Sequence, residues 1–187
     1  MPGQIDLFVF FGLIAGGKST LAAAWAEKLG AGYYNSDRVR KELAGLQANA
    51  PQQESFNAGI YTPEFSRRTY ARMLALAEED LAAGKKVVLD GSYQAPEERA
   101  LVIELAQRMA RGLKFILCRC SENVTKQRLT IRAHDKEAVS DGRWEIYCQQ
   151  KEHFTMSAEL TSDNLLTLNT EGTVDELLGK LVHVSAP

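Results

Sequence analysis

Apolar and polar positions follow two different periods along this chain, and the first forty residues contain both. The run from Ile5 to Phe11 is short and almost continuously apolar, which is typical of a strand that is buried on both faces. Leu21, Trp25 and Leu29 then recur every four residues, as on one face of a helix. Gly30 follows as a helix stop signal. The pattern therefore predicts a strand, a turn and a helix in succession.

The same alternation continues through the rest of the chain. We expect further strands at 32–35, 86–90, 113–118 and 164–168, and helices at 36–43, from Thr62 to before Gly84, from Pro96 past Met109, at 121–132, from about 142, and at 174–181. Strands that are separated by helices indicate a parallel, doubly wound α/β sheet with helices on both faces. Without a repeat or a linker, residues 1–187 are expected to form one domain.

The turn between the first strand and the first helix carries the strongest motif, G-x-x-x-x-G-K-[ST], known as Walker A. Its glycines let backbone N–H groups turn inward around a polyphosphate at a helix N-terminus. Lys18 can reach the β- and γ-phosphates, and the Ser19 hydroxyl can join the shell of a magnesium ion. The residues expected to contact the nucleotide are Gly12, Ala15, Gly16, Gly17, Lys18, Ser19 and Thr20. The alternative is that these glycines form only a flexible turn. The sequence contains no guanine-recognition signature, so ATP is the expected nucleotide.

The composition of the chain limits the classes of binding partner and the cellular compartment that we expect. The formal net charge is −2 and no lysine- or arginine-rich block is present, which disfavours a dedicated nucleic-acid binder. The three cysteines are an odd number without zinc-type spacing, which fits a cytoplasmic protein, and Cys118 and Cys120, in or beside a predicted strand, are expected to pack in the core. We expect no signal peptide or membrane span, because the apolar N-terminal run is too short and continues into the phosphate loop.

Two carboxylates follow predicted strands, at the edge of the sheet where ligands of doubly wound folds bind. Asp37 comes just after the second strand, with Arg40 three residues later on the same helix face. Asp37 suits a general base, and Arg40 could hold the acceptor or the transferring phosphoryl group. The alternative is that Ser36 and Asp37 only cap the helix.

Asp90 ends the third strand and resembles a Walker B aspartate, which steadies magnesium together with Ser19; the alternative is an Asx-type turn. The order of the chain leaves open whether Asp37 or Asp90 lies nearer the metal. Both predictions place chemistry at one end of the sheet, beside the phosphate loop.

Two segments without strong periodicity are expected to cover the site. Arg128 and Arg132 lie one helical turn apart, before a short polar stretch. We predict a lid at about 128–142 whose arginines close onto the phosphates and exclude water, with a solvated amphipathic helix as the alternative. Residues 46–61 are too long and irregular for an ordinary connection, which favours a functional cover. Trp144 and Tyr147 are expected in the core.

These segments together resemble the small P-loop kinases of the zeta-toxin and polynucleotide-kinase type. The match runs through Gly12–Thr20, Ser36–Gly45, Tyr61–Glu64, Val87–Asp90 and the Arg128/Arg132 pair. The resemblance implies an adenylate-kinase-like, three-layer P-loop fold with strand order 2-3-1-4-5 and ATP with Mg²⁺ as donor. It also implies that Asp37 is the general base, that Arg40 binds phosphate, and that the acceptor lies between the Asp37 helix and the lid.

Three functions remain open. The first is an ATP-dependent kinase for the hydroxyl group of a small molecule, with Asp37 as base and with Lys18, Arg128 and Arg132 stabilising the developing charge. The second is a polynucleotide 5′-hydroxyl kinase, which the Asp37/Arg40 spacing and the basic stretch at 108–143 favour and the acidic net charge disfavours. The third is a nucleotide-sensing module without transfer, which would not need the Asp37/Arg40 pair.

Overall fold

The computed structural model describes residues 4–47, 59–133, 143–156 and 159–185, and five parallel strands form the central sheet of this part of the chain. Their order is β2-β3-β1-β4-β5, which confirms the predicted topology. The strands are β1 (Ile5–Phe11), β2 (Gly32–Asn35), β3 (Val87–Asp90), β4 (Gly112–Arg119) and β5 (Leu165–Asn169).

The continuous apolar run of β1 follows from its central place. It pairs with β3 on one side and β4 on the other, and Leu7–Phe11 are almost completely inaccessible to solvent. The odd-numbered side chains of this segment pack under one layer of helices, and Phe8 and Phe10 pack under the other. Because neither face meets water along Leu7–Phe11, these five residues are all apolar, and the polar Asp6 lies where the strand begins and is only partly buried.

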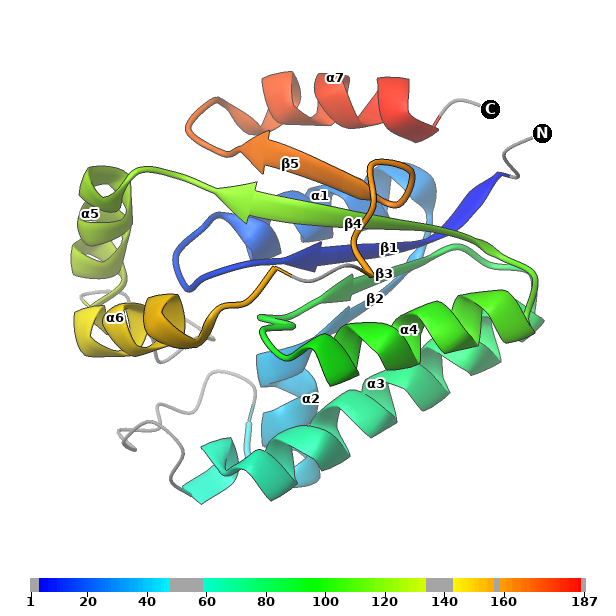
Figure 1. Ribbon diagram of the computed structural model, residues 1–187, viewed down its shortest axis with the longest axis horizontal. Coiled ribbons are helices and arrows are strands. Elements are labelled where there is room, and N and C mark those ends of the chain that lie inside the picture. The colour runs from blue at the N-terminus through cyan, green and yellow to red at the C-terminus, as the bar shows by residue number, and fades with distance from the viewer. Residues whose placement is uncertain (1–3, 48–58, 134–142, 157–158, 186–187) are drawn as a thin grey trace.

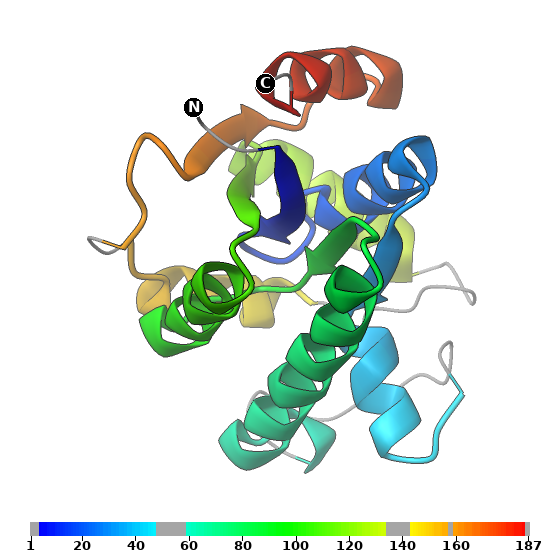
Figure 2. The same ribbon diagram turned by 90° about the vertical axis from the view of Figure 1, so that its right-hand side faces the viewer.

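Seven helices of the described residues cover the two faces and one end of this sheet: α1 (Lys18–Leu29), α2 (Ser36–Leu43), α3 (Pro63–Ala82), α4 (Pro96–Arg108), α5 (Glu122–Ala133), α6 (Trp144–His153) and α7 (Val174–Ser185). Helices α1 and α7 pack on one face, and α3 and α4 on the other (Figures 1 and 2). Helices α5 and α6 lie beyond the carboxyl ends of the strands (Figure 1). None of the described helices has the length and apolarity needed to cross a bilayer.

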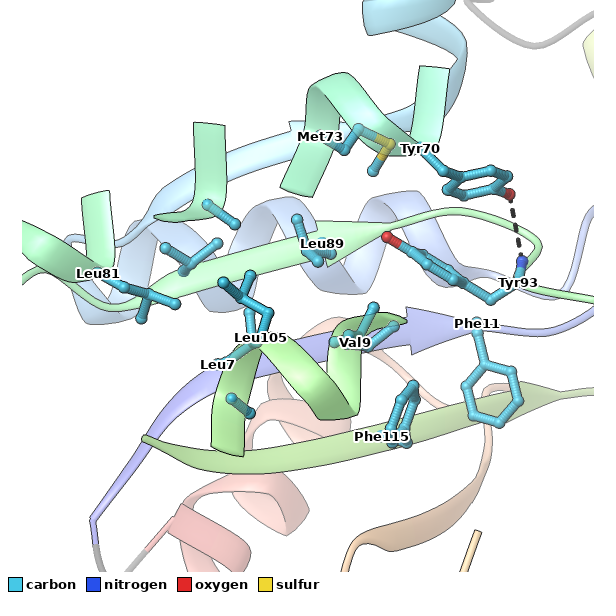
Figure 3. Packing of buried hydrophobic residues seen from close by; sticks show 14 of the residues in the cluster. Leu7, Val9, Phe11, Tyr70, Met73, Leu81, Leu89, Tyr93, Leu105 and Phe115 are labelled. Carbon is cyan, nitrogen blue, oxygen red and sulfur yellow. Dashed lines mark hydrogen bonds between the residues drawn. The ribbon is translucent and has the colours of Figure 1, made fainter. Parts of the chain in front are cut away.

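The larger core lies between the sheet and helices α3 and α4. Tyr70 and Met73 of α3 and Leu105 of α4 close over β1, β3 and β4 (Figure 3). Full burial of a large apolar side chain contributes roughly 1.5–3 kcal/mol. This layer also extends toward the site, because the Tyr70 hydroxyl accepts a hydrogen bond of 3.3 Å from the backbone N–H of Tyr93, in the loop after β3 (Figure 3).

The structure corrects the expected cap of α2. Asn35, not Ser36, is the N-cap: its backbone is extended and its side-chain oxygen accepts a 3.1 Å hydrogen bond from the Arg38 N–H. Ser36 is already the first helical residue. Thr62 caps α3 and Pro63 opens it, as predicted. Residues 134–142 of the expected lid and 48–58 of the expected cover lie outside the described residues. The last three residues of the expected cover form the short 3₁₀ turn Gly59–Tyr61.

Candidate active site

The phosphate loop joins β1 to α1, and two of its glycines are required by the backbone. Gly12 has φ 126° and Gly17 has φ 81°, in the left-handed region that side chains disfavour. A Cβ on Gly12 would also lie 2.7 Å from the carbonyl oxygen of Cys118 in β4. The Gly12 N–H donates to the Ser92 carbonyl at 3.3 Å, so the loop is tied to the segment that follows β3.

Lys18 places its ammonium group against the phosphate loop. Its Nζ donates to the Leu13 carbonyl at 2.7 Å, so the side chain folds back across the loop. Burial lowers the pKa of the Lys18 ammonium, while the nearby Asp90 carboxylate opposes that shift. A cation fixed in this way is suited to phosphate oxygens that approach the loop.

Asp90 is wholly buried at the carboxyl end of β3, opposite Asn35 in the register of β2. Its Oδ2 accepts hydrogen bonds from the Tyr33 hydroxyl at 2.8 Å and from Asn35 Nδ2 at 2.6 Å. Asn35 Nδ2 is also 3.5 Å from Ser19 Oγ, so the amide links the carboxylate to the phosphate loop. Burial and the neighbouring Asp90 both raise the pKa of Tyr33, which keeps its hydroxyl a donor.

The other oxygen of Asp90, Oδ1, is buried and has no hydrogen-bond partner in the part of the chain that the structure describes. A buried carboxylate oxygen without a partner fits a cation site, and the Ser19 hydroxyl adds a second oxygen of the kind that Mg²⁺ prefers. No group of three His, Cys, Asp or Glu side chains suited to a metal occurs among the described residues. The oxygens of Ser19 and Asp90 would suit Mg²⁺ that keeps water and phosphate oxygens as its other ligands.

A cavity of about 550 Å³ opens over the loop and extends between α2, α3 and α4. Most of the predicted site residues line it: Ala15, Gly17, Lys18, Ser19, Asp37, Arg40, Asp90 and Arg132. Asp37 reaches it from the first turn of α2, and Arg132 from the last turn of α5. Ala15 and Arg132, which are 117 positions apart in the sequence, thus line one cavity at the edge of the sheet where the strands end.

Arg40 is buried on α2 and faces the same cavity. Its side chain is only 6% exposed, and its guanidinium carbon lies 4.8 Å from the centre of the Tyr61 ring. The Nε atom is buried without a hydrogen-bond partner among the described residues. Arg40 therefore brings to the wall of the cavity a guanidinium group with one unsatisfied, buried donor.

The structure places Arg128 differently from its helical neighbour Arg132. Its guanidinium donates to the Ala15 carbonyl at 3.2 Å and to the Thr170 carbonyl at 2.6 Å. Thr170 is 2% exposed, and its hydroxyl donates to the Gly16 carbonyl at 2.7 Å. Arg128 and Thr170 together fix the carbonyls of the phosphate loop, and Arg128 lines only the second cavity.

That second cavity, of about 320 Å³, lies beside α1 and α7. Gly17 lines both cavities, so the loop stands between them. The walls are mostly apolar, with Leu21, Val174 and Leu177 among them.

Helix α6 supports the loop from the remaining side. Tyr147 is 6% exposed and packs with Ala15 and Leu129, while Trp144 stacks on Tyr147 with ring centres 4.8 Å apart. Tyr147 therefore belongs to a small buried cluster, and the partly buried Trp144 packs against it. Gln150 Oε1 accepts a 2.8 Å hydrogen bond from the Ile14 N–H, which adds a further anchor.

A comparison with known families agrees with this geometry: the model of the AAA domain family AAA_33 matches residues 7–156, well over half of the chain. The chain belongs to this AAA domain family. Uncharacterised proteins of Mycobacterium tuberculosis H37Rv and Mycobacterium bovis are 30% identical to it over 117 residues. The match covers 63% of this chain and 24% of those proteins, so the chain spans about a quarter of their length.

Solved structures place this AAA-family chain among P-loop kinase folds. A sugar kinase from Janibacter sp. HTCC2649 superposes with a TM-score of 0.67 at 15% identity, covering 96% of this chain and 93% of that one. A gluconokinase from Sinorhizobium meliloti 1021 gives 0.59 at 21% identity, with 98% and 94% covered. The APS kinase CysC of M. tuberculosis, in complex with AMPPNP and APS, gives 0.63 at 17% identity, with 98% of both chains covered.

Sequence reasoning missed Glu98, which lines the main cavity of this AAA-family site from the first turn of α4. Its Oε2 is buried without a hydrogen-bond partner among the described residues, and burial raises the pKa of the carboxyl to about 7. An acid in a first helical turn is ordinary, because the helix dipole favours it there. No local pattern marked Glu98, and the same holds for Thr170 after β5.

Proposed function

We propose that this protein transfers the γ-phosphoryl group of ATP to a hydroxyl group of a small-molecule acceptor. The observation that carries the proposal is that the phosphate loop, the buried Asp90 and the Asp37 carboxylate share one cavity, with room left beyond the loop. The kinase folds that superpose on the chain include a sugar kinase and a gluconokinase, which supports a small acceptor.

The two cavities suggest where the donor lies. The phosphates would rest on the N–H groups of the loop and beside Lys18, and the nucleoside would enter the apolar cavity next to Leu21 and Val174. Ser19 and Asp90 would hold Mg²⁺. The bound ion would neutralise charge on the phosphate oxygens as it spreads.

Transfer needs a proton acceptor and fixed cations. In the proposed step the acceptor oxygen bonds to the γ-phosphorus, the bond from that phosphorus to the bridging β–γ oxygen breaks, and ADP leaves. Asp37 would accept the hydroxyl proton, a role worth about 10²–10⁴ in rate. Lys18 and Arg132, which line the same cavity, would stabilise the charge on the transferred group. The predicted closure of a lid over 128–142 remains part of this proposal.

The decisive experiment is label transfer from γ-labelled ATP into an extract of small metabolites, with a 5′-hydroxyl oligonucleotide tested in parallel. Lys18→Ala and Asp37→Asn are the test variants, and Lys28→Ala, an exposed lysine on the same helix α1, is the matched control. A new labelled metabolite with wild type and control, absent with Lys18→Ala and about 10²–10⁴-fold slower with Asp37→Asn, supports the proposal.

Other results would overturn it. Label in the oligonucleotide alone would assign a polynucleotide kinase, as in the polynucleotide-kinase-like resemblance. Tight nucleotide binding with label only in ATP or free phosphate would assign a nucleotide-sensing module.

A further inference from the structure

Two residues that line the main cavity carry buried polar atoms without hydrogen-bond partners. Arg40 Nε on α2 and Glu98 Oε2 on α4 both lack a hydrogen bond among the described residues. Both side chains line the cavity, which they share with Tyr61 and Tyr70. Folded proteins leave few such atoms unsatisfied, because each one loses its hydrogen bonds to water without replacement. A ligand in this space would supply both missing partners.

The two atoms need hydrogen-bond partners of opposite kinds. Arg40 Nε carries a hydrogen and can only donate, whereas an ionised Glu98 can only accept. A hydroxyl group does both, so one hydroxyl or two neighbouring ones can satisfy the pair. The Tyr70 hydroxyl does not serve this purpose, because it is within 3.1 Å of Ser92 Oγ and accepts from the Tyr93 N–H.

The charge of the cavity lining argues against an anionic acceptor. Among the described residues, its acidic and basic side chains are Lys18, Asp37, Arg40, Arg67, Asp90, Glu97, Glu98 and Arg132. Four acids and four bases leave no surplus of cations. Recognition of a carboxylate or a phosphate characteristically uses unpaired cations with several donors, and the proposed function already assigns Lys18 and Arg132 to the phosphates of ATP.

We propose that the part of the cavity lined by Arg40 and Glu98 is an acceptor subsite for an uncharged polyhydroxylated molecule, a sugar or a polyol. Arg40 donates to its hydroxyl groups and Glu98 accepts from them. The assignment deepens the proposed kinase function and rests on it only for the fate of the bound molecule, since binding itself needs no transfer. Glu98 is then the residue that selects hydroxyl donors over anions.

Binding is measured by calorimetry on the full chain in the presence of AMPPNP and Mg²⁺. The ligands are a panel of aldoses, alditols and cyclitols that includes glucose, sorbitol and myo-inositol, with gluconate and glucose 6-phosphate as charged counterparts. Glu98→Ala is the test variant, and Glu104→Ala, an exposed acid on the same helix, is the control. We expect at least one uncharged ligand to bind more tightly than its charged counterpart, and Glu98→Ala to weaken that binding about 10- to 100-fold.

The control should bind the same ligand as wild type does, and AMPPNP affinity should not change in either variant. If Glu98→Ala does not fold, Glu98→Gln replaces it. The inference is overturned if no uncharged ligand binds, if its binding survives loss of the Glu98 carboxylate, or if gluconate binds more tightly than sorbitol. Polyol binding that needs Glu98, without label transfer from ATP, would uphold the subsite and overturn the kinase proposal.

Discussion

Replacing Glu98 with glutamine should stabilise the folded protein at alkaline pH. Burial raises the pKa of this carboxyl from its ordinary 4.5 to about 7. The folded state therefore holds the proton more tightly than the unfolded chain, and the free energy of unfolding of the wild type falls as pH rises from about 4.5 to about 7. That difference in pKa corresponds to about 3 kcal/mol above pH 7. Glutamine has nearly the same shape and no proton to lose, so it avoids this penalty.

Urea unfolding of the ligand-free protein at pH 5, 6 and 8 measures the effect. The stability of Glu98→Gln relative to wild type should increase by about 2–3 kcal/mol between pH 5 and pH 8, most of it by pH 7. Glu104→Gln, on the exposed side of the same helix, should show no such change. If the difference between Glu98→Gln and wild type stayed constant with pH, or decreased, the carboxyl would not be buried as the structure describes.

Further predictions concern the phosphate loop and its neighbours. Asp90→Asn keeps a side-chain oxygen for its hydrogen bonds but removes the carboxylate charge. It should abolish the strengthening of ATP binding by Mg²⁺ and leave the midpoint of urea unfolding almost unchanged. If ATP binding still depended on Mg²⁺, the proposed metal role of Asp90 would be excluded. Thr170→Val leaves the buried Gly16 carbonyl without its donor, which should cost about 1–3 kcal/mol of stability and weaken ATP binding in titrations; a wild-type midpoint would contradict that anchor. Gly12→Ala places a methyl group 2.7 Å from the Cys118 carbonyl at φ 126°, so a thermal melt should show a clear loss of stability, and an unchanged melt would refute that close packing.

Most of the fold could be predicted because its elements differ in burial. The continuous apolar run of β1 marks a strand between two helical layers, and the four-residue period after it marks a helix with one buried face. The order of the strands did not follow from periodicity; it came from the family resemblance. Local pattern also failed at the start of α2, where Asn35 and Ser36 are both good caps and only the extended backbone of Asn35 decides between them.

Residues of the candidate site could be predicted only where they belong to a local motif or end a strand. Lys18 and Asp90 sit at a motif and at a strand end, so position alone indicated them. Glu98 could not be found in this way, because its burial comes from tertiary packing around α4, and in sequence it looks like any acid of a first helical turn. Tertiary contacts, not local preference, give it an unusual pKa.

The placement of Arg128 shows why an arginine in a helical pair need not face the substrate. A loop that turns its N–H groups toward phosphates must have its carbonyls fixed elsewhere, and here Arg128 and Thr170 bond the carbonyls of Ala15 and Gly16. Ala15 has φ 57°, a conformation that a non-glycine residue keeps only when its surroundings hold it. This geometry favours Arg128 as a residue that positions the loop. Arg132, one turn further along α5, lines the main cavity, where the proposed function would place the transferred group. The loop therefore loses its conformational entropy when the protein folds and not when a ligand binds. Preorganisation of this kind increases the affinity of a site for its ligand.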